Sequence, residues 1–309
     1  MRRGLGLLAL IATSACAYYN GLYNARGLVR RAESASRDGR DSTAIAAWRE
    51  AAAKADTVIA RYPRSRWTDD ALLLSGTSSA FAGHCVHGLQ RLGQWEKHPG
   101  ADTRDHTRAS VARGACLVRL GEPARALDTL APFVSHGDET LSRIAAAWAA
   151  RAALATSRPD SAIVLARAAG SDALDGELAR QALTAGDVAR ATRILGQRAR
   201  EWRSPSLMYA PLEQLARVNR GSADSIVQIT QSGRASRLER ARLSVVAASW
   251  AEGAGDEQSA RRHYDRALGM SADTALVTDV ITRLALLDVR TAVTVDEARA
   301  RLERARAKA

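Results

Sequence analysis

The sequence predicts an all-α protein built from repeated helical hairpins, and three observations support this. The apolar content is carried by Ala, Leu and Val, with only 2 Phe, 6 Tyr and 6 Trp, while the good helix formers Arg and Glu are abundant. Alternating strand patterns are confined to short ambiguous pieces such as DSIVQIT. Glycines also recur at regular spacing before helical Ala/aromatic patterns.

The N-terminus has the layout of a secretory signal, because two arginines precede an apolar run that is too short to span a bilayer as a helix. The small residues before Cys16 resemble the lipobox of bacterial lipoproteins, which implies a signal peptide over 1–15, a lipidated Cys16 and an anchor linker over 16–26. Thr13 stands where that family usually has an aliphatic residue. Two alternatives therefore stay open: ordinary signal cleavage after Ala17, or a retained N-terminus.

The next segment predicts two helices with a short break between them. The first ends at Tyr62 and Pro63, and Thr68 caps the second, which places Asp69 and Asp70 in its first turn, facing the positive end of the macrodipole. We interpret the two aspartates as helix-start residues and not as a catalytic pair. Over roughly 18–83, the chain resembles the N-terminal part of tetratricopeptide lipoproteins of the outer-membrane assembly type.

A ladder of small and large residues continues along the chain. One copy is Gly114, Gly121, Ala126, Leu130 and Phe133. The turn residues of successive copies are Gly39, Gly83, Gly121, Ser157, Gly186, Gly221 and Gly255, in steps of 44, 38, 36, 29, 35 and 34. These steps scatter around the tetratricopeptide period, about 34 residues, and small residues allow two antiparallel helices to pack closely. The resemblance implies a right-handed superhelical solenoid of tetratricopeptide-like hairpins.

We expect six to seven hairpins over 27–290, followed by a capping helix over 291–309. The hairpin near 205–235 is degenerate, and its two prolines, Pro205 and Pro211, are expected to break it. Thr294 and Glu297 form a capping box for the last helix.

The cysteines and histidines offer the main candidates for chemistry. With Cys16 lipidated, Cys85 and Cys116 form an even pair that is either a disulfide or two buried thiols. One cluster has metal-ligand residue types: His84, Cys85, His87, His98 and His106. It lacks the spacing of a zinc site, and the chain has no nucleotide-binding or nucleophile motif, so we predict no metal, cofactor or catalytic residue. The six tryptophans are interpreted as packing between hairpins.

The chain is strongly basic, with a formal net charge of +12, and nearly all its cations are arginine. Five arginines project from comparable points of the first helices of the predicted hairpins: Arg108, Arg119, Arg151, Arg180 and Arg242. They would form a basic groove for acidic peptide segments or an anionic polymer. The alternative is a compositional bias that scatters arginine everywhere. Nucleic acid is a poor candidate because no aromatic residues interleave the arginines.

The resemblance implies a non-enzymatic scaffold, anchored by Cys16 at the periplasmic face of the outer membrane, that binds other envelope proteins and no small-molecule substrate. Ala17 after the cysteine resembles the outer-membrane sorting pattern. Two alternatives are a soluble periplasmic adaptor of a polymer or secretion apparatus, and a solenoid enzyme acting on peptidoglycan. The enzyme would need a catalytic glutamate in a separate compact domain, and no stretch leaves the repeat pattern long enough to supply one.

Overall fold

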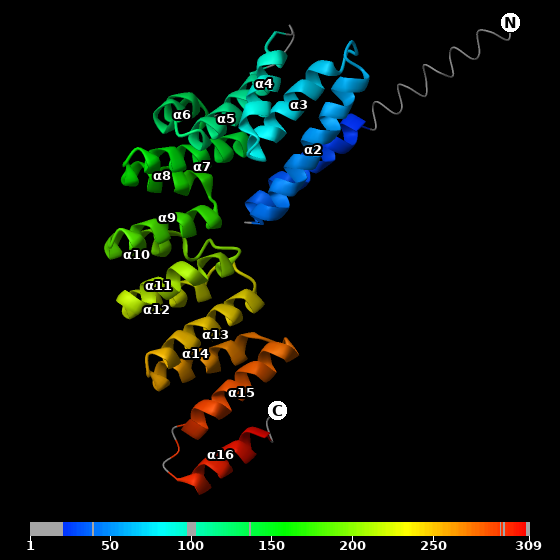
Figure 1. Ribbon diagram of the computed structural model, residues 1–309. Helices are drawn as coiled ribbons and strands as arrows, with labels where there is room; N and C mark the ends of the chain where they lie inside the picture. The colour runs from blue at the N-terminus through cyan, green and yellow to red at the C-terminus, as the bar shows by residue number, and fades with distance from the viewer. Residues whose placement is uncertain are drawn as a thin grey trace, which may run out of the picture. The chain divides into compact units, whose positions relative to one another are not determined.

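A computed structural model describes residues 21–38, 40–97, 103–135, 137–290, 292 and 294–306. This part of the chain folds into helices joined by turns and contains no strand, which confirms the all-α prediction (Figure 1). The predictions for the signal, for Cys16, for the turn at Gly39 and for His98 lie outside the described residues. The anchor linker predicted over 16–26 is wrong for its described part, because residues 21–26 are helical and Leu22 and Ala25 are buried in the core. None of the described helices combines the length and the apolar character needed to cross a membrane.

The chain divides into two compact units, Met1–Ser171 and Asp172–Ala309, called here the first and second units. In the first, a helix over 21–37 precedes α2, and helices then pair as hairpins. The elements are α2 (Asp41–Arg61), α3 (Thr68–Phe81), α4 (Cys85–Trp95), α5 (Thr103–Arg119), α6 (Pro123–Leu130), the short η1 (Ala131–Phe133), α7 (Glu139–Ala155) and α8 (Pro159–Ala169). Helix α3 packs on α5, and α5 packs on α7, so the first helices of successive hairpins lie side by side (Figure 1).

The second unit repeats this arrangement. Its elements are α9 (Asp172–Thr184), α10 (Val188–Arg198), η2 (Pro205–Met208), α11 (Tyr209–Val218), α12 (Arg220–Gln231), α13 (Arg237–Gly253), α14 (Glu257–Met270), α15 (Thr274–Arg290) and α16 (Val295–Arg306). The hairpins are α9/α10, α11/α12, α13/α14 and α15/α16, and the first helices α9, α11 and α13 contact one another in order. In each unit we call the surface formed by the first helices the first-helix face.

The turns of the hairpins follow the predicted ladder. Gly83, Gly121, Gly186 and Gly255 have φ between 72° and 93°, and Ser157 reaches 56°, in the left-handed region that glycine adopts at no steric cost. The prediction for Gly221 is wrong. This residue lies in the first turn of α12, because the side chain of Asn219 accepts a hydrogen bond from the Ser222 amide and starts the helix earlier.

Small residues let the paired helices approach closely, as the ladder predicted. A Cβ on Gly88 of α4 would lie 2.9 Å from the Ala80 amide nitrogen and 2.9 Å from the Gly76 carbonyl oxygen of α3. A Cβ on Gly76 would in turn lie 2.8 Å from the side chain of Leu92. The hairpin α3/α4 therefore has room for nothing larger than hydrogen at these positions.

The break before α3 differs from the prediction in one respect. Helix α2 ends at Arg61 with Tyr62 as its C-cap, and Asp69 and Asp70 lie in the first turn of α3, as expected. Thr68 is not the N-cap: it is the first helical residue, and its hydroxyl donates to the Tyr62 carbonyl at 3.0 Å. The hydroxyl thus ties the new helix to the end of the old one.

The prolines and the C-terminal capping residues occupy helix starts. Pro205 begins η2 and Pro211 lies in the first turn of α11, so they shape the start of the α11/α12 hairpin and do not break it. At the last helix, the Thr294 hydroxyl accepts a hydrogen bond from the Glu297 amide at 3.2 Å, which is half of the predicted capping box.

Candidate functional site

All five arginines assigned to the basic groove lie on first helices. Arg108 and Arg119 are on α5, Arg151 is on α7, Arg180 is on α9 and Arg242 is on α13. Three therefore belong to the first unit and two to the second. Within the first unit, the structure brings Arg119 and Arg151 to one shared side chain, Trp148 of α7.

Arg119, Trp148 and Arg151 form what we call the Arg–Trp–Arg cluster. The guanidinium carbons of Arg119 and Arg151 lie 4.5 and 5.1 Å from the ring centroid of Trp148, which is half-buried. Each such cation–π contact contributes about 0.5–1 kcal/mol at exposed sites. The cations also repel each other: partial burial and then the charge of Arg151 lower the pKa of Arg119.

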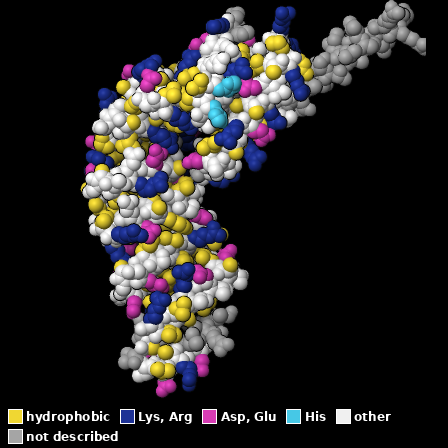
Figure 2. Space-filling model, in the orientation of Figure 1, with side chains coloured by type: hydrophobic (Ala, Val, Ile, Leu, Met, Phe, Trp, Pro, Cys, Tyr) yellow, Lys and Arg dark blue, Asp and Glu magenta, His cyan; other side chains and the backbone are white. Residues whose placement is uncertain are grey.

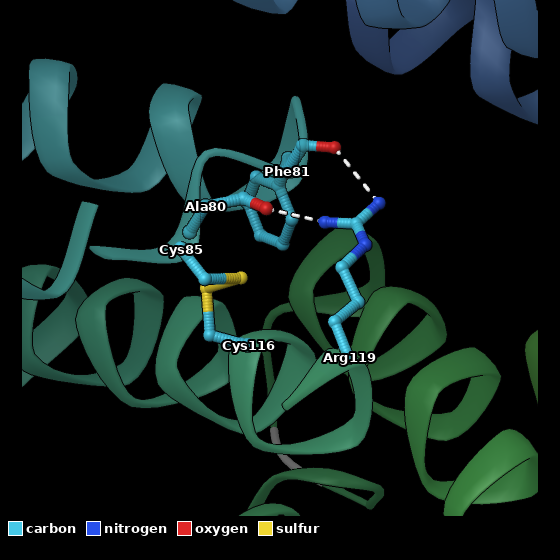
Figure 3. Close-up of a disulfide and its surroundings, with 5 residues drawn as sticks. All are labelled: Ala80, Phe81, Cys85, Cys116 and Arg119. Carbon is cyan, nitrogen blue, oxygen red and sulfur yellow. Dashed lines mark hydrogen bonds between the residues drawn. A yellow bond between two sulfur atoms is a disulfide. The ribbon is translucent and has the colours of Figure 1, made fainter. Parts of the chain in front are cut away.

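Arg119 is also held in place by the end of α3 (Figure 3). Its guanidinium donates to the carbonyl oxygens of Ala80 and Phe81, the latter at 3.1 Å, at the C-terminal end of α3. The Ala80 carbonyl also accepts from the Gly83 amide at 3.1 Å, and a cation suits the negative end of the α3 dipole. The fork of Arg119 is thereby fixed between α3 and α7.

A disulfide supports the same corner of the first unit (Figure 3). Cys85, the first residue of α4, is bonded to Cys116 of α5, with Cα atoms 5.3 Å apart. Both cysteines are buried, and Cys116 lies one helical turn before Arg119. Of the two alternatives left open by the sequence, the structure has the disulfide, and this bond fixes the α3–α4 turn to the helix that carries Arg119.

The other predicted groove residues are in different environments. Arg108 lies 3.8 Å from the Glu33 carboxylate of the helix over 21–37, and both side chains are largely buried. Arg242 and Arg180 are both exposed, and Arg242 pairs with Glu239 at 3.3 Å. Figure 2 shows Lys and Arg spread among Asp and Glu over the visible face of each unit. Among the five arginines of the predicted groove, Arg119 and Arg151 are the pair that the described residues bring onto one side chain, and the groove itself stays a prediction.

Of the residues with metal-ligand character, His87 belongs to a polar network centred on Asp56. His87 lies with its Nε2 2.9 Å from Asp56, which also accepts hydrogen bonds from Ser75 and Arg91 at 2.8 and 2.9 Å. Asp56 thus joins α2, α3 and α4. No group of three or more ligand side chains is found within the described residues. This network was not predicted from the sequence. The one local feature that points to it is the i, i+4 spacing of His87 and Arg91, which places both side chains on one side of α4.

A second polar cluster, also missed, is buried in the second unit. Arg198, at the end of α10, donates to Asp175 at 2.6 Å and lies 3.6 Å from Asp172 in the first turn of α9. Asp172 also accepts the amides of Arg203 and Ser204, at 2.8 and 3.1 Å. Burial raises the pKa of Asp175 to about 7, against the opposing charge of Arg198. We call Asp172, Asp175 and Arg198 the Arg198 cluster.

The fold and the site together define an all-helical protein of repeated hairpins with an arginine–tryptophan cluster on its first-helix face. No family model matches the chain, and no curated protein matches it either.

Several solved structures are similar to the chain, and two of them are described here. A tetratricopeptide repeat protein from Parabacteroides merdae ATCC 43184 matches at 13% identity and a TM-score of 0.38, over 84% of this chain and 97% of that one. The APC/C hetero-tetramer Cut9-Hcn1 matches at 16% identity and a TM-score of 0.37, over 93% of this chain. The chain spans 52% of the matched chain in that second structure.

Proposed function

We propose that the protein is a non-enzymatic, exported scaffold that binds other proteins through its first-helix face. The Arg–Trp–Arg cluster takes an acidic segment of the partner. The observation that carries this proposal is the placement of two arginines from two different first helices on one half-buried tryptophan ring. Guanidinium groups pair bidentately with carboxylates, which are the anions that proteins display most often.

The electrostatics of the cluster favour an anionic ligand. The charge of Arg151 contributes to the lowered pKa of Arg119, which reports a repulsion between the two cations. A carboxylate placed near both guanidinium groups would be attracted by both positive charges. The bonds from Arg119 to the end of α3 keep its side chain ordered before the ligand arrives, which reduces the entropic cost of binding.

Export and anchoring form the finer part of the proposal. The Cys85–Cys116 disulfide supports an oxidising compartment, where such bonds persist. Lipidation of Cys16, placement at the outer membrane and a role in envelope assembly rest on the sequence resemblance. The test is the mass of the mature N-terminal peptide, with and without an inhibitor of lipoprotein signal peptidase. A lipidated Cys16 peptide that disappears with inhibitor supports the anchor, whereas an unmodified peptide beginning at Tyr18 contradicts it.

The binding proposal is tested with Arg151→Glu, which reverses one charge of the cluster. The probe is a fluorescent peptide of alternating Glu and Gly, with a Lys/Gly peptide as the comparator, and anisotropy is measured at low salt. We expect R151E to weaken binding of the acidic peptide at least about tenfold, because one attractive charge becomes repulsive. The same variant should capture less partner protein from an envelope extract.

The matched control is Arg167→Glu, which makes the same charge change at an exposed position of α8, a second helix of the first unit. We expect R167E to bind the acidic peptide within about twofold of wild type, because net charge alone has a small effect. Equal losses in R151E and R167E would assign binding to overall charge. Unchanged binding by R151E would remove the cluster from the function.

A further inference from the structure

The turn between α2 and α3 carries a group of exposed arginines beside a tryptophan, which we call the basic turn. Arg61 is the last residue of α2, and Arg64 and Arg66 follow it before α3 begins. All three arginines are exposed, and no ion pair of theirs is found among the described residues. The guanidinium carbon of Arg66 lies 4.6 Å from the ring centroid of Trp67, which is half-buried.

The basic turn lies at the end of the first unit where the N-terminal segment joins the fold. Gly21 already belongs to the helix over 21–37, and a Cβ on it would lie 3.0 Å from the side chain of Val58, one helical turn before Arg61. At the same end, Arg26 pairs with Asp70 of α3 at 2.9 Å. The start of the first helix, the end of α2 and the start of α3 therefore meet at one end.

The proposed lipid anchor is only a short stretch of chain away from this end. Cys16 precedes Gly21 by five residues. A chain of that length spans at most about 18 Å even when it is fully extended. A lipid attached to Cys16 would therefore hold this end of the first unit close to the surface of the bilayer.

The charges at this end are predominantly positive. Asp69 and Asp70 lie in the first turn of α3, and Asp70 is paired with Arg26. Two carboxylates thus stand against four arginines, namely Arg26 and the three arginines of the basic turn. Guanidinium groups pair bidentately with phosphate, and tryptophan is favoured at the boundary between headgroups and acyl chains.

We propose that the basic turn binds the anionic phospholipid headgroups of a membrane surface, so that the first unit contacts the bilayer through the turn between α2 and α3. Each arginine near an anionic surface contributes about as much as a fivefold change in affinity. The membrane setting rests on the proposed anchor at Cys16. The contact itself needs only charge and an exposed turn, so it can be measured without the lipid.

The experiment measures flotation of the full chain with vesicles. The chain carries Cys16→Ser, which prevents lipidation, and the vesicles contain either phosphatidylcholine alone or phosphatidylcholine with 30% phosphatidylglycerol. We expect at least about tenfold tighter binding to the anionic vesicles at low salt. The difference should shrink as salt is added, because the Debye length falls from about 10 Å at 0.1 M to about 3 Å at 1 M.

A double substitution assigns the binding to the basic turn. Arg61→Gln with Arg64→Gln should weaken binding to the anionic vesicles at least about tenfold, because two attractive charges are lost. The matched control is Arg167→Gln with Arg193→Gln, at exposed positions of the second helices α8 and α10, and it should bind within about twofold of the parent chain. The N-terminal apolar run is common to all these chains, so differences between them report on the substituted positions.

Two results would overturn the proposal. The first is equal vesicle binding by the R61Q/R64Q chain and its parent, or equal losses in the two double variants. The second is a loss of binding to the Glu/Gly peptide in R61Q/R64Q with vesicle binding unchanged, which would assign the turn to an acidic protein. Because the C16S chain carries no lipid, neither result decides the anchor, which the mass of the N-terminal peptide tests separately.

Discussion

Asp175 is a buried carboxyl group whose charge depends on its surroundings. Burial raises its pKa to about 7, Arg198 opposes that rise and Asp172 adds to it. The folded state therefore holds the Asp175 proton at pH values where the unfolded chain, with its ordinary value of 3.8, has lost it. The carboxyl group consequently contributes stability that is fully present below about pH 4 and is lost as the pH rises through about 7.

We predict that Asp175→Asn removes this pH dependence. An amide of the same size cannot ionise, so between about pH 5 and pH 8 the free energy of unfolding should fall by ~1–2 kcal/mol less in D175N than in wild type. Urea unfolding at both pH values, followed by far-UV circular dichroism, measures the difference. If D175N and wild type lose the same stability over this range, the titrating group lies outside the Arg198 cluster.

At the scale of single residues, the sequence predicted which helix a side chain lies on better than which other side chains it contacts. It placed the five arginines on first helices, because helical spacing is a local property, and it left Cys85 and Cys116 as either a disulfide or two buried thiols. It could not separate Arg198, whose charge is buried against Asp175, from the many exposed arginines of the chain. Trp148 was likewise interpreted as packing alone, since the guanidiniums that stack on it come from two helices.

At the scale of helices, the repeat ladder predicted most turns and close helix contacts correctly, because sterics restrict the residue type at those positions. A turn that needs a left-handed φ, or a contact that excludes a Cβ, restricts the residue type at one position. The ladder failed at Gly221, where Asn219 offers a stronger start signal two residues earlier. It also did not predict the division after Ser171, although the step across it, from Ser157 to Gly186, is 29 residues and the shortest of the six.

Gly114 tests the contact between α5 and α6. A Cβ at this position would lie 2.4 Å from side-chain atoms of Leu130, which is fully buried. Gly114→Ala should therefore destabilise the first unit by about 1–3 kcal/mol, although alanine is the better helix former. Thermal and urea unfolding measure the change.

The matched control for Gly114 is Gly93, a glycine within α4 whose added Cβ would meet no atom within 4 Å. Gly93→Ala should be neutral or stabilise by up to about 1 kcal/mol, because only helix propensity changes. A loss of stability in G93A as large as that in G114A would mean that glycine serves a purpose other than close packing in these hairpins.

At the scale of the whole molecule, the two compact units contain different stabilising interactions. The first contains the Cys85–Cys116 disulfide, and the second contains the Arg198 cluster. Each unit has its own paired hairpins and its own buried side chains, such as Leu92 and Leu130 in the first and Trp202 and Tyr264 in the second. A substitution in the disulfide or in the Arg198 cluster should therefore change the stability of mainly the unit that contains it.

We predict that replacing both cysteines by alanine destabilises the first unit by about 3–4 kcal/mol, the value expected from the chain entropy of a loop with a sequence separation of 31. The second unit should keep its stability. Urea unfolding followed by hydrogen exchange, with the protected amides assigned to helices by mass spectrometry, reads the units separately. The double variant should lose protection in α3 to α6 at lower urea, with α9 to α14 unchanged.

D175N completes this test, because it changes the Arg198 cluster of the second unit and leaves the disulfide of the first unit intact. It should alter the pH dependence of protection in α9 and α10 and leave α3 to α6 as in wild type, whereas the cysteine variant should do the reverse. Two independent responses mean that the units unfold separately, as units with separate cores do. If either change instead shifts protection equally along the whole chain, the two units unfold as one cooperative body, and the division after Ser171 is geometric only.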